Sequence, residues 1–180
     1  MPEDKNKFIN EAGKYGLILA AAAIFYFLLN AFLGKIENVG FLMSLLGIVL
    51  WAAKFSLCIW LMFRFLRAFA AGHDYDRSGT FRFGMVVSLC SSLVYAGFYL
   101  LYVSVLDPRF FSGVFDSIAQ VYSSLLTSEE MDRLMNMESS MPTTSFFVNF
   151  IWCSLVGIII SAVAAGKICG SDDPFANDNR

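Results

Sequence analysis

A single lysine, Lys54, interrupts an otherwise uncharged run that extends from Asn38 to Phe63. Near the centre of a bilayer a lysine costs about 2.5–3.5 kcal/mol, so we expect its ammonium group to have a compensating partner. Trp51, three residues earlier on the same helix face, is a candidate for a cation–π contact. Neutral candidates at comparable depth in the other apolar runs are Tyr26, Tyr95, Ser91, Ser92 and Ser154.

Three roles for Lys54 remain open from the sequence. The lysine can be tolerated without a function, either neutral or reaching toward the interface. It can bind an anionic lipid or a partner's carboxylate, or it can relay protons or substrate. Arg64 and Arg67, one helical turn apart at the expected membrane face, are candidates for contact with anionic headgroups or markers of topology alone. Lys54, Arg64 and Arg67 are therefore the candidate lipid or partner contacts.

Residue types that could hold a metal or catalyse a reaction are sparse. The single histidine, His73, has Asp74 and Asp76 beside it, which is too few converging ligands for a metal site and is typical of a solvated loop. Four cysteines (Cys58, Cys90, Cys153 and Cys169) lack the paired spacing of zinc or redox sites, so we expect them to act as small apolar residues. We therefore expect no catalytic residues, no cofactor, no metal and no enzymatic activity.

The elements that position these residues follow from the composition. The 180 residues are 57% hydrophobic and 16% charged, with a formal net charge of -2 and a mean hydropathy of +0.61. This composition excludes a water-soluble domain, and the small charge argues against a nucleic-acid partner. Crossing a bilayer takes roughly 20 apolar helical residues. The sequence therefore predicts an all-α, polytopic protein that forms one membrane domain over residues 1–180, with four spans near 15–34, 40–63, 83–106 and 143–166.

Basic residues predict the orientation of these spans. Three lie before the first span, four between the second and third, and two after the fourth, whereas Lys35, Arg109 and Arg133 lie on the other side. Nine against three predicts that both termini are cytoplasmic, in a bacterial inner membrane. Residues 35–38 then form a tight outer turn. A cleaved signal peptide in place of the first span is disfavoured, because Leu29 to Gly34 offers no clear cleavage site.

The long outer loop, 107–141, is predicted to contain two helices. Asp107–Pro108 is a helix stop, and apolar residues at helical spacing follow it from Phe111 to Leu125, which predicts an amphipathic helix along the outer leaflet. Thr127 and Glu130 have the form of a capping box for a second helix, and Pro142 has the form of a helix start for the fourth span. Six acids and two arginines give this loop a net charge of -4. It is expected to cap the bundle or to provide a docking surface.

Small residues at intervals of four predict where the helices pack, because close backbone approach drives helix association in lipid. These stripes can pack against each other or against a partner's helix. Shorter series, Ala12–Gly16–Ala20, Gly40–Ser44 and Ala52–Ser56, occur in the first two spans. The main series are Gly84, Ser88, Ser92 and Ala96 in the third span, and Cys153, Gly157, Ser161, Ala165 and Cys169 in the fourth.

The order of these features resembles the bacterial membrane family catalogued as domain of unknown function 4199, common in Bacteroidetes, over nearly the whole chain. The residues that carry the resemblance are Tyr15–Gly16, Gly79-x-x-x-Phe83–Gly84, Asp107–Pro108, the acidic helical loop and Pro174–Phe175. Asp76–Arg77 departs from the family, in which an Arg-Asp pair is more usual. The resemblance supplies no activity or catalytic residue. It does imply a genomic context beside a polyprenol-phosphate glycosyltransferase, which is therefore an expected partner.

Two functions remain open on these grounds. The first is a non-catalytic accessory or scaffolding subunit of a membrane complex, supported by the lack of paired membrane acids and nucleophile motifs. The second is a small transporter or flippase for a polyprenol-phosphate-linked sugar, which would work as a homodimer because four helices enclose little space. A polar groove that reaches Lys54 would favour transport, and a dry interior with an exposed small-residue stripe would favour a subunit.

Overall fold

The structure, a computed structural model, describes the backbone of residues 2–33, 40–73, 77–122 and 127–169. Inside these ranges, side chains are described except at 2–5, 40–44, 73, 114, 117, 122, 128, 131, 134 and 135. The described residues form helices and contain no strand: α1 (Pro2–Leu33), α2 (Gly40–His73), α3 (Arg77–Leu101), η1 (Tyr102–Leu106), α4 (Ser112–Tyr122) and α5 (Ser128–Cys169). The predicted outer turn at 35–38 and the loop residues Asp74 to Asp76 lie outside the described residues.

Four stretches are long and apolar enough to cross a membrane: Asn6–Leu33, Leu45–Gly72, Arg77–Leu106 and Asn136–Cys169. The all-α fold and the multi-pass membrane character predicted from the sequence are thus confirmed. The helices themselves run past the predicted spans, since α2 continues to His73 and α1 already begins at Pro2.

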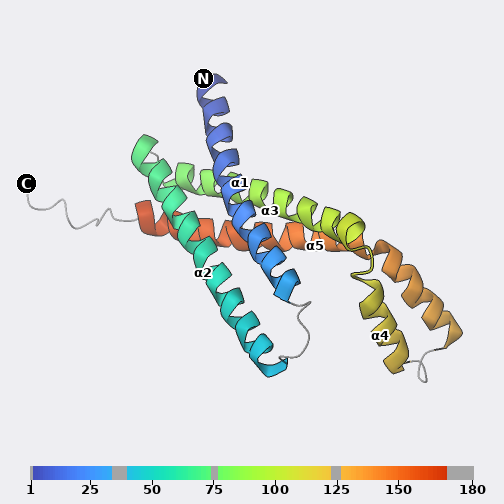
Figure 1. The fold of residues 1–180 in the computed structure, drawn as a ribbon. Coiled ribbons are helices and arrows are strands. Elements are labelled where there is room, and N and C mark those ends of the chain that lie inside the picture. The colour runs from blue at the N-terminus through green and yellow to red at the C-terminus, as the bar shows by residue number, and fades with distance from the viewer. Residues whose placement is uncertain (1, 34–39, 74–76, 123–126, 170–180) are drawn as a thin grey trace, which may run out of the picture.

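The four long helices form two crossing pairs. In Figure 1, the axes of α1 and α2 are roughly parallel, with the chain running in opposite directions, and both helices cross over α3 and α5, which lie side by side. Among the described elements, α3 makes its most extensive contacts with α5 and then with α1. The N-terminal part of α1 lies at the same end of the bundle as the C-terminal ends of α2 and α5. We call this the terminal end, and the opposite end, which carries α4, the α4 end.

The apolar core lies toward the terminal end. Aromatic rings dominate it: Phe69 stacks on Phe83 with ring centroids 3.7 Å apart, and Phe8 meets both rings edge-on. Tyr15 of α1 stacks on Phe65 of α2 at 4.6 Å. The buried core residues are Ala12, Met62, Leu66, Phe69, Phe83, Val87 and Ala164. All four long helices contribute to this core, so it fixes their positions at this end.

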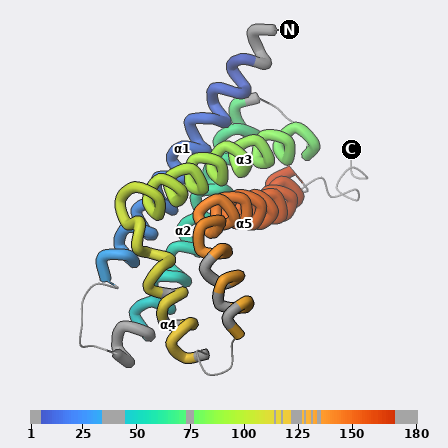
Figure 2. The backbone as a smooth tube through the Cα atoms, turned by 90° about the vertical axis from the view of Figure 1, so that its right-hand side faces the viewer, coloured from blue at the N-terminus to red at the C-terminus, as the bar shows by residue number. Residues whose placement is uncertain are grey.

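At the α4 end, both α3 and α5 depart from regular α-helix. The last turn of α3 widens into the π-helix η1, in which the Asp107 N–H donates to the Tyr102 carbonyl at 2.9 Å. The helix then ends at Asp107, directly before Pro108, which confirms the predicted stop. Figures 1 and 2 show α4 and the N-terminal part of α5 extending together beyond this end.

The predicted start of the fourth helix at Pro142 is wrong. Residues 128–169 form one continuous helix, α5, with Pro142 in its interior. Proline has no N–H to donate to the Glu138 carbonyl and its ring crowds that carbonyl, so the helix bends there instead of ending. Figure 1 shows the bend between the part of α5 that lies beside α4 and the part that packs on α3.

The predicted capping box is confirmed at the start of α5. The Thr127 backbone N–H donates to a Glu130 carboxylate oxygen at 2.8 Å, and the Glu130 N–H donates to the Thr127 hydroxyl at 3.4 Å. These bonds satisfy two groups that a helix start leaves without partners. Because the Thr127 backbone N–H and hydroxyl donate to the carboxylate, the pKa of Glu130 lies below its ordinary value of 4.5.

Candidate functional site

A cavity of about 370 Å³ lies among the four long helices, and Lys54 is part of its wall. The lining from α2 includes Trp51, Lys54, Phe55, Cys58 and Met62. The other helices contribute Leu19 and Ala23 from α1; Ser88, Ser91, Ser92 and Tyr95 from α3; and Trp152, Cys153, Val156, Gly157 and Ile160 from α5. Its volume is near the lower limit of ordinary ligand pockets, about 300–1,000 Å³.

The course of α2 explains why the cavity exists. Its buried residues, Met62, Phe65, Leu66 and Phe69, belong to its second half, whereas Leu45 to Val49 in its first half are largely exposed. The helix therefore packs tightly at the terminal end and is less covered toward the α4 end. Lys54, Cys58 and Met62 are spaced by four, so they continue the inward face of α2 into the region where packing is lost. Lys54 lies at the point where the helices begin to separate.

Two tyrosine rings hold the Lys54 ammonium group. Its Nζ lies 4.8 Å from the ring centroid of Tyr26 on α1 and 5.4 Å from that of Tyr95 on α3. A desolvated cation–π contact stabilises by about 2 kcal/mol, so two rings together are comparable to the 2.5–3.5 kcal/mol insertion cost of the lysine. Within the described part of the chain, Nζ has no hydrogen bond or ion pair. Its N–H donors remain able to meet an anion.

The part of the cavity wall that α3 forms carries hydroxyl groups. The Ser88 hydroxyl donates to the Gly84 carbonyl at 2.8 Å, and the Ser92 hydroxyl donates to the Ser88 carbonyl at 2.7 Å. Ser91 and Tyr95 are buried on the same helix. The lining residues include no carboxylate, so the polar part of this cavity consists of one cation, hydroxyl groups and thiols. Such a wall suits an anion or a hydrogen-bond acceptor rather than a cation.

The cavity opens sideways, on the surface that faces lipid. Trp51 of α2 and Trp152 of α5 both line it, yet 59% and 68% of their surfaces are exposed. Phe55, on the same border, is also exposed. A molecule in the membrane could thus pass between these side chains to Lys54 without first entering water. In the membrane this opening presents an apolar rim and a cationic interior.

α3 packs closely against α5 next to the cavity, whose lining includes Ser88 and Gly157 from this contact. A Cβ atom on Gly84 would lie 2.7 Å from Cβ of Ser161, and one on Gly157 would lie 2.7 Å from Cβ of Ser88. Each glycine thus lets the serine of the other helix pack directly against its backbone. Ser92, Ala96 and Ala165 are buried along the same two helices. Gly16 of α1 makes a third such contact, against Cys90.

A comparison with known families covers most of the chain, including every residue that lines the Lys54 cavity. Residues 14–166 match the family model described as "Protein of unknown function (DUF4199)", which is well over half of the chain. The chain belongs to the DUF4199 family. The matched range contains the Tyr15–Gly16, Phe83–Gly84 and Asp107–Pro108 motifs, whereas Pro174–Phe175 lies beyond it and outside the described residues. No curated protein and no solved structure matches this DUF4199 chain.

The remaining predicted contacts of this DUF4199 protein lie apart from the cavity. Arg64 is exposed on α2, and its guanidinium lies 5.3 Å from the ring centroid of Trp60, one turn away. Arg67 is exposed one turn further along. Neither arginine lines the cavity, so the three candidate contacts do not form one site. His73 is the last residue of α2, and its side chain is not among those described.

The expected partners of Lys54 are partly corrected. Of the neutral candidates, Tyr26 and Tyr95 contact the ammonium group, and Ser91 and Ser92 line the same cavity. Trp51 instead stacks on Phe55, with ring centroids 5.8 Å apart, because both side chains lie at the lipid-facing border. Ser154 is buried, and its hydroxyl has no hydrogen-bond partner in the described part of the chain.

Sequence reasoning did not identify Cys58, Cys153 and Gly157 as cavity residues. The four-residue spacing of Lys54 and Cys58 does place them on one face of α2. On α5, Cys153 and Gly157 belong to the stripe predicted for packing, and a stripe of small residues looks the same whether it touches another helix or borders a void. Cys58 of α2 is expected from the sequence only to act as a small apolar residue.

Proposed function

We propose that this DUF4199 protein is a non-catalytic accessory membrane protein that binds the anionic group of a membrane amphiphile in the Lys54 cavity. The proposal rests on the position of Lys54 Nζ, which lies near two tyrosine rings at a cavity whose rim is exposed to lipid. The amphiphile's carboxylate or phosphate would meet the ammonium group. Its hydrocarbon chain would leave between Trp51 and Trp152.

Electrostatics in a low-dielectric region support an anionic ligand. Charges attract each other far more strongly inside an apolar region than in water, but each also loses its hydration. Lys54 has already been inserted into the membrane, and its two ring contacts offset much of that cost. An arriving anion therefore has to be compensated only for its own desolvation. The Ser88 and Ser92 hydroxyls already donate to backbone carbonyls, so among the α3 hydroxyl groups of the cavity those of Ser91 and Tyr95 can add hydrogen-bond donors.

The accessory role is supported by the outer face of α2. Ala52 and Ser56, one pair of small residues on this helix, are exposed, whereas Gly84, Ser88, Ser92 and Ala96 of the α3 stripe are buried. A partner's transmembrane helix could approach closely along them. We propose a polyprenol-phosphate glycosyltransferase as the partner, since its lipid substrate carries the kind of anion that the cavity suits. The protein would then hold or present this lipid.

A second function, transport of the same lipid class by a homodimer, is favoured by the sideways opening of the cavity. A flippase needs a path for a headgroup through the apolar layer, and Lys54 would be the phosphate contact on this path. Flipping of a fluorescent anionic lipid by the purified protein in vesicles, if lost in Lys54→Met, would support transport over the accessory role.

We place the protein in a bacterial inner membrane with both termini in the cytoplasm. The excess of basic residues on the terminal side supports this orientation. A reporter fused after Arg180 should be active only as a cytoplasmic reporter. Extracytoplasmic activity of that fusion would contradict the orientation.

Tryptophan fluorescence tests the binding proposal directly. Bromine atoms quench nearby indoles, so a dibromo-stearic acid bound in the cavity should quench Trp51 and Trp152 with a saturable dependence on its concentration. The third tryptophan, Trp60, is replaced by phenylalanine in all samples. Loss of a charge-assisted contact worth about 1.5–3 kcal/mol should weaken the apparent affinity of Lys54→Met roughly 10- to 150-fold.

Lys167→Met is the matched control, because Lys167 is an exposed lysine at the end of α5. It should bind as the parent protein does. Lys54→Arg keeps the charge and should retain most of the affinity. Equal quenching in Lys54→Met and Lys167→Met would refute the proposed role of Lys54.

A further inference from the structure

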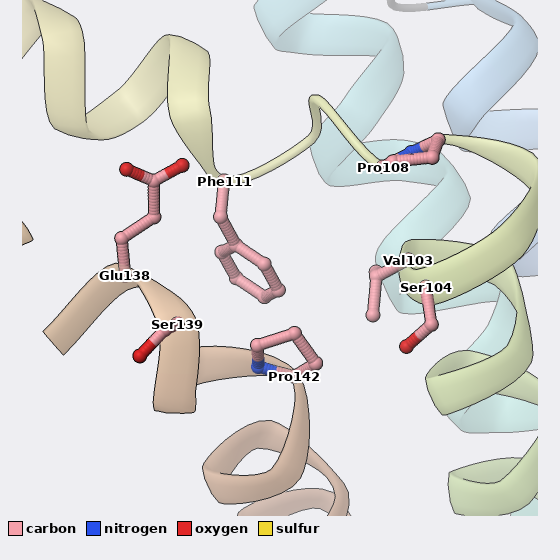
Figure 3. Close-up of a pocket in the computed structure, with 7 residues that line it drawn as sticks. All are labelled: Val103, Ser104, Pro108, Phe111, Glu138, Ser139 and Pro142. Atoms are coloured by element: carbon pink, nitrogen blue, oxygen red, sulfur yellow. The ribbon is translucent and has the colours of Figure 1, made fainter. Parts of the chain in front are cut away.

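A second cavity, of about 440 Å³, lies at the α4 end between the end of α3 and the bend of α5. It is separate from the Lys54 cavity and shares no lining residue with it. Figure 3 shows its lining: Val103, Ser104, Pro108, Phe111, Glu138, Ser139 and Pro142. No lysine, arginine or histidine is among these residues, and Glu138 is the one charged side chain.

Two prolines leave hydrogen-bond acceptors at this cavity. Pro142 has no N–H for the carbonyl of Glu138, four residues earlier in α5. In η1 the Asp107 N–H donates to the Tyr102 carbonyl, so the next bond of the series would join Val103 to residue 108, which is also proline. The carbonyls of Glu138 and Val103 therefore lack their helical donors. Both residues and both prolines line the cavity.

Side chains add further acceptors and an aromatic face. Glu138 contributes a carboxylate, and in Figure 3 the Phe111 ring extends toward Pro142 between Glu138 and Val103. The Ser139 hydroxyl already donates to the Asn136 carbonyl at 2.8 Å, so its hydrogen is occupied. The cavity thus offers carbonyl and carboxylate oxygens and one aromatic face. An ammonium group, with several N–H donors and a positive charge, complements all three features.

The location and charge of the cavity agree with such a ligand. Its residues lie where two of the candidate spans end, at Leu106 and at Asn136, which is the depth of lipid headgroups. The surrounding segment, 107–141, carries a net charge of -4 from six acids and two arginines. One of these arginines, Arg133, forms an ion pair with Glu129 at 2.7 Å. The excess negative charge attracts a cation to this end of the bundle.

We propose that the cavity at the α4 end binds a primary ammonium group, as carried by an ethanolamine headgroup. The Glu138 carboxylate pairs with the ammonium charge, the Glu138 backbone carbonyl accepts one of its N–H groups, and the Phe111 ring, which lies between Glu138 and Val103, covers one side. The site is independent of Lys54 and selects the opposite charge. A lipid headgroup and a free amine share this chemistry, and the test separates them.

The test measures which lipids stay bound to the purified protein in nanodiscs made from equal parts phosphatidylethanolamine, phosphatidylcholine and phosphatidylglycerol. Native mass spectrometry should find phosphatidylethanolamine retained about fivefold over phosphatidylcholine, because a quaternary ammonium has no N–H to donate. Glu138→Gln should abolish this preference. Asp132→Asn, which removes one exposed acid of the same segment away from the cavity, should keep it.

Equal retention of the two zwitterionic lipids by the wild-type protein would overturn the proposal, as would identical losses in Glu138→Gln and Asp132→Asn. The wild-type comparison does not depend on how well either variant folds. Added ethanolamine at millimolar concentration identifies the source of the ammonium group. Displacement of the lipid shows that the amine alone is recognised, and an undisturbed preference assigns the site to the lipid headgroup.

Discussion

At the scale of single residues, the pairing of Lys54 with Tyr26 and Tyr95 explains how a lysine is held inside the apolar layer. Both rings belong to the group of neutral partners that equal depth along the spans predicts. Depth can be counted from the sequence, because each helical residue advances about 1.5 Å along the axis. The orientation of an aromatic side chain, unlike its depth, cannot be derived from the position of the residue in the sequence. Trp51 therefore looked equally suitable and yet stacks on Phe55.

The glycine contacts between α3 and α5 give a prediction at this scale. Gly84→Ala places a methyl group 2.7 Å from Ser161, so the two helices must separate, and we expect a loss of about 1–3 kcal/mol in the free energy of unfolding. Unfolding of the purified protein by increasing denaturing detergent measures this loss.

Gly97→Ala on the same helix is the control, since no atom lies within 4 Å of the new Cβ. It should leave stability unchanged or slightly higher, because alanine is the better helix former. If both variants unfolded at the same detergent concentration, the close contact at Gly84 would not contribute to stability.

At the scale of helices, sequence periodicity and composition were enough to predict the number and type of the long elements, but not their ends. The capping box at Thr127 is local, since its two residues are three apart in the chain, and it was predicted correctly. The prediction that Pro142 starts a helix is wrong, because a proline can either start a helix or bend one. Which of the two happens depends on whether the preceding turn is held by other contacts. Here α4 packs beside the N-terminal part of α5.

The π-helix Tyr102–Leu106 shows the same limit. Asp107–Pro108 correctly predicted the stop, but no residue type in Tyr102–Leu106 marks a π-helical turn, which is a rare conformation. The cavity at the α4 end depends on both departures from regular helix. The cavity was therefore not predictable from the sequence, although three of its lining residues, Pro108, Glu138 and Pro142, are evident in the sequence itself.

At the scale of the whole molecule, the packing of the four long helices differs between the two ends of the bundle. The helices are tightly packed by aromatic residues at the terminal end and less so toward the α4 end, and Lys54 lies where they separate. The sequence predicted that small residues would pack the bundle and that Lys54 would need a partner. It could not predict that α2 leaves α5 before Lys54 is covered, because that depends on the crossing of two helix pairs (Figure 2).

Binding of an anionic amphiphile in the Lys54 cavity is tested most directly by identifying the lipid that occupies this cavity in the cell. Wild-type protein and Lys54→Met are extracted gently from the producing membranes, and the lipids that remain bound are identified by native mass spectrometry. The account predicts a bound amphiphile with a carboxylate or phosphate in the wild type and its loss, by at least about tenfold, in Lys54→Met. The same anionic lipid retained at the same level by both proteins would contradict it.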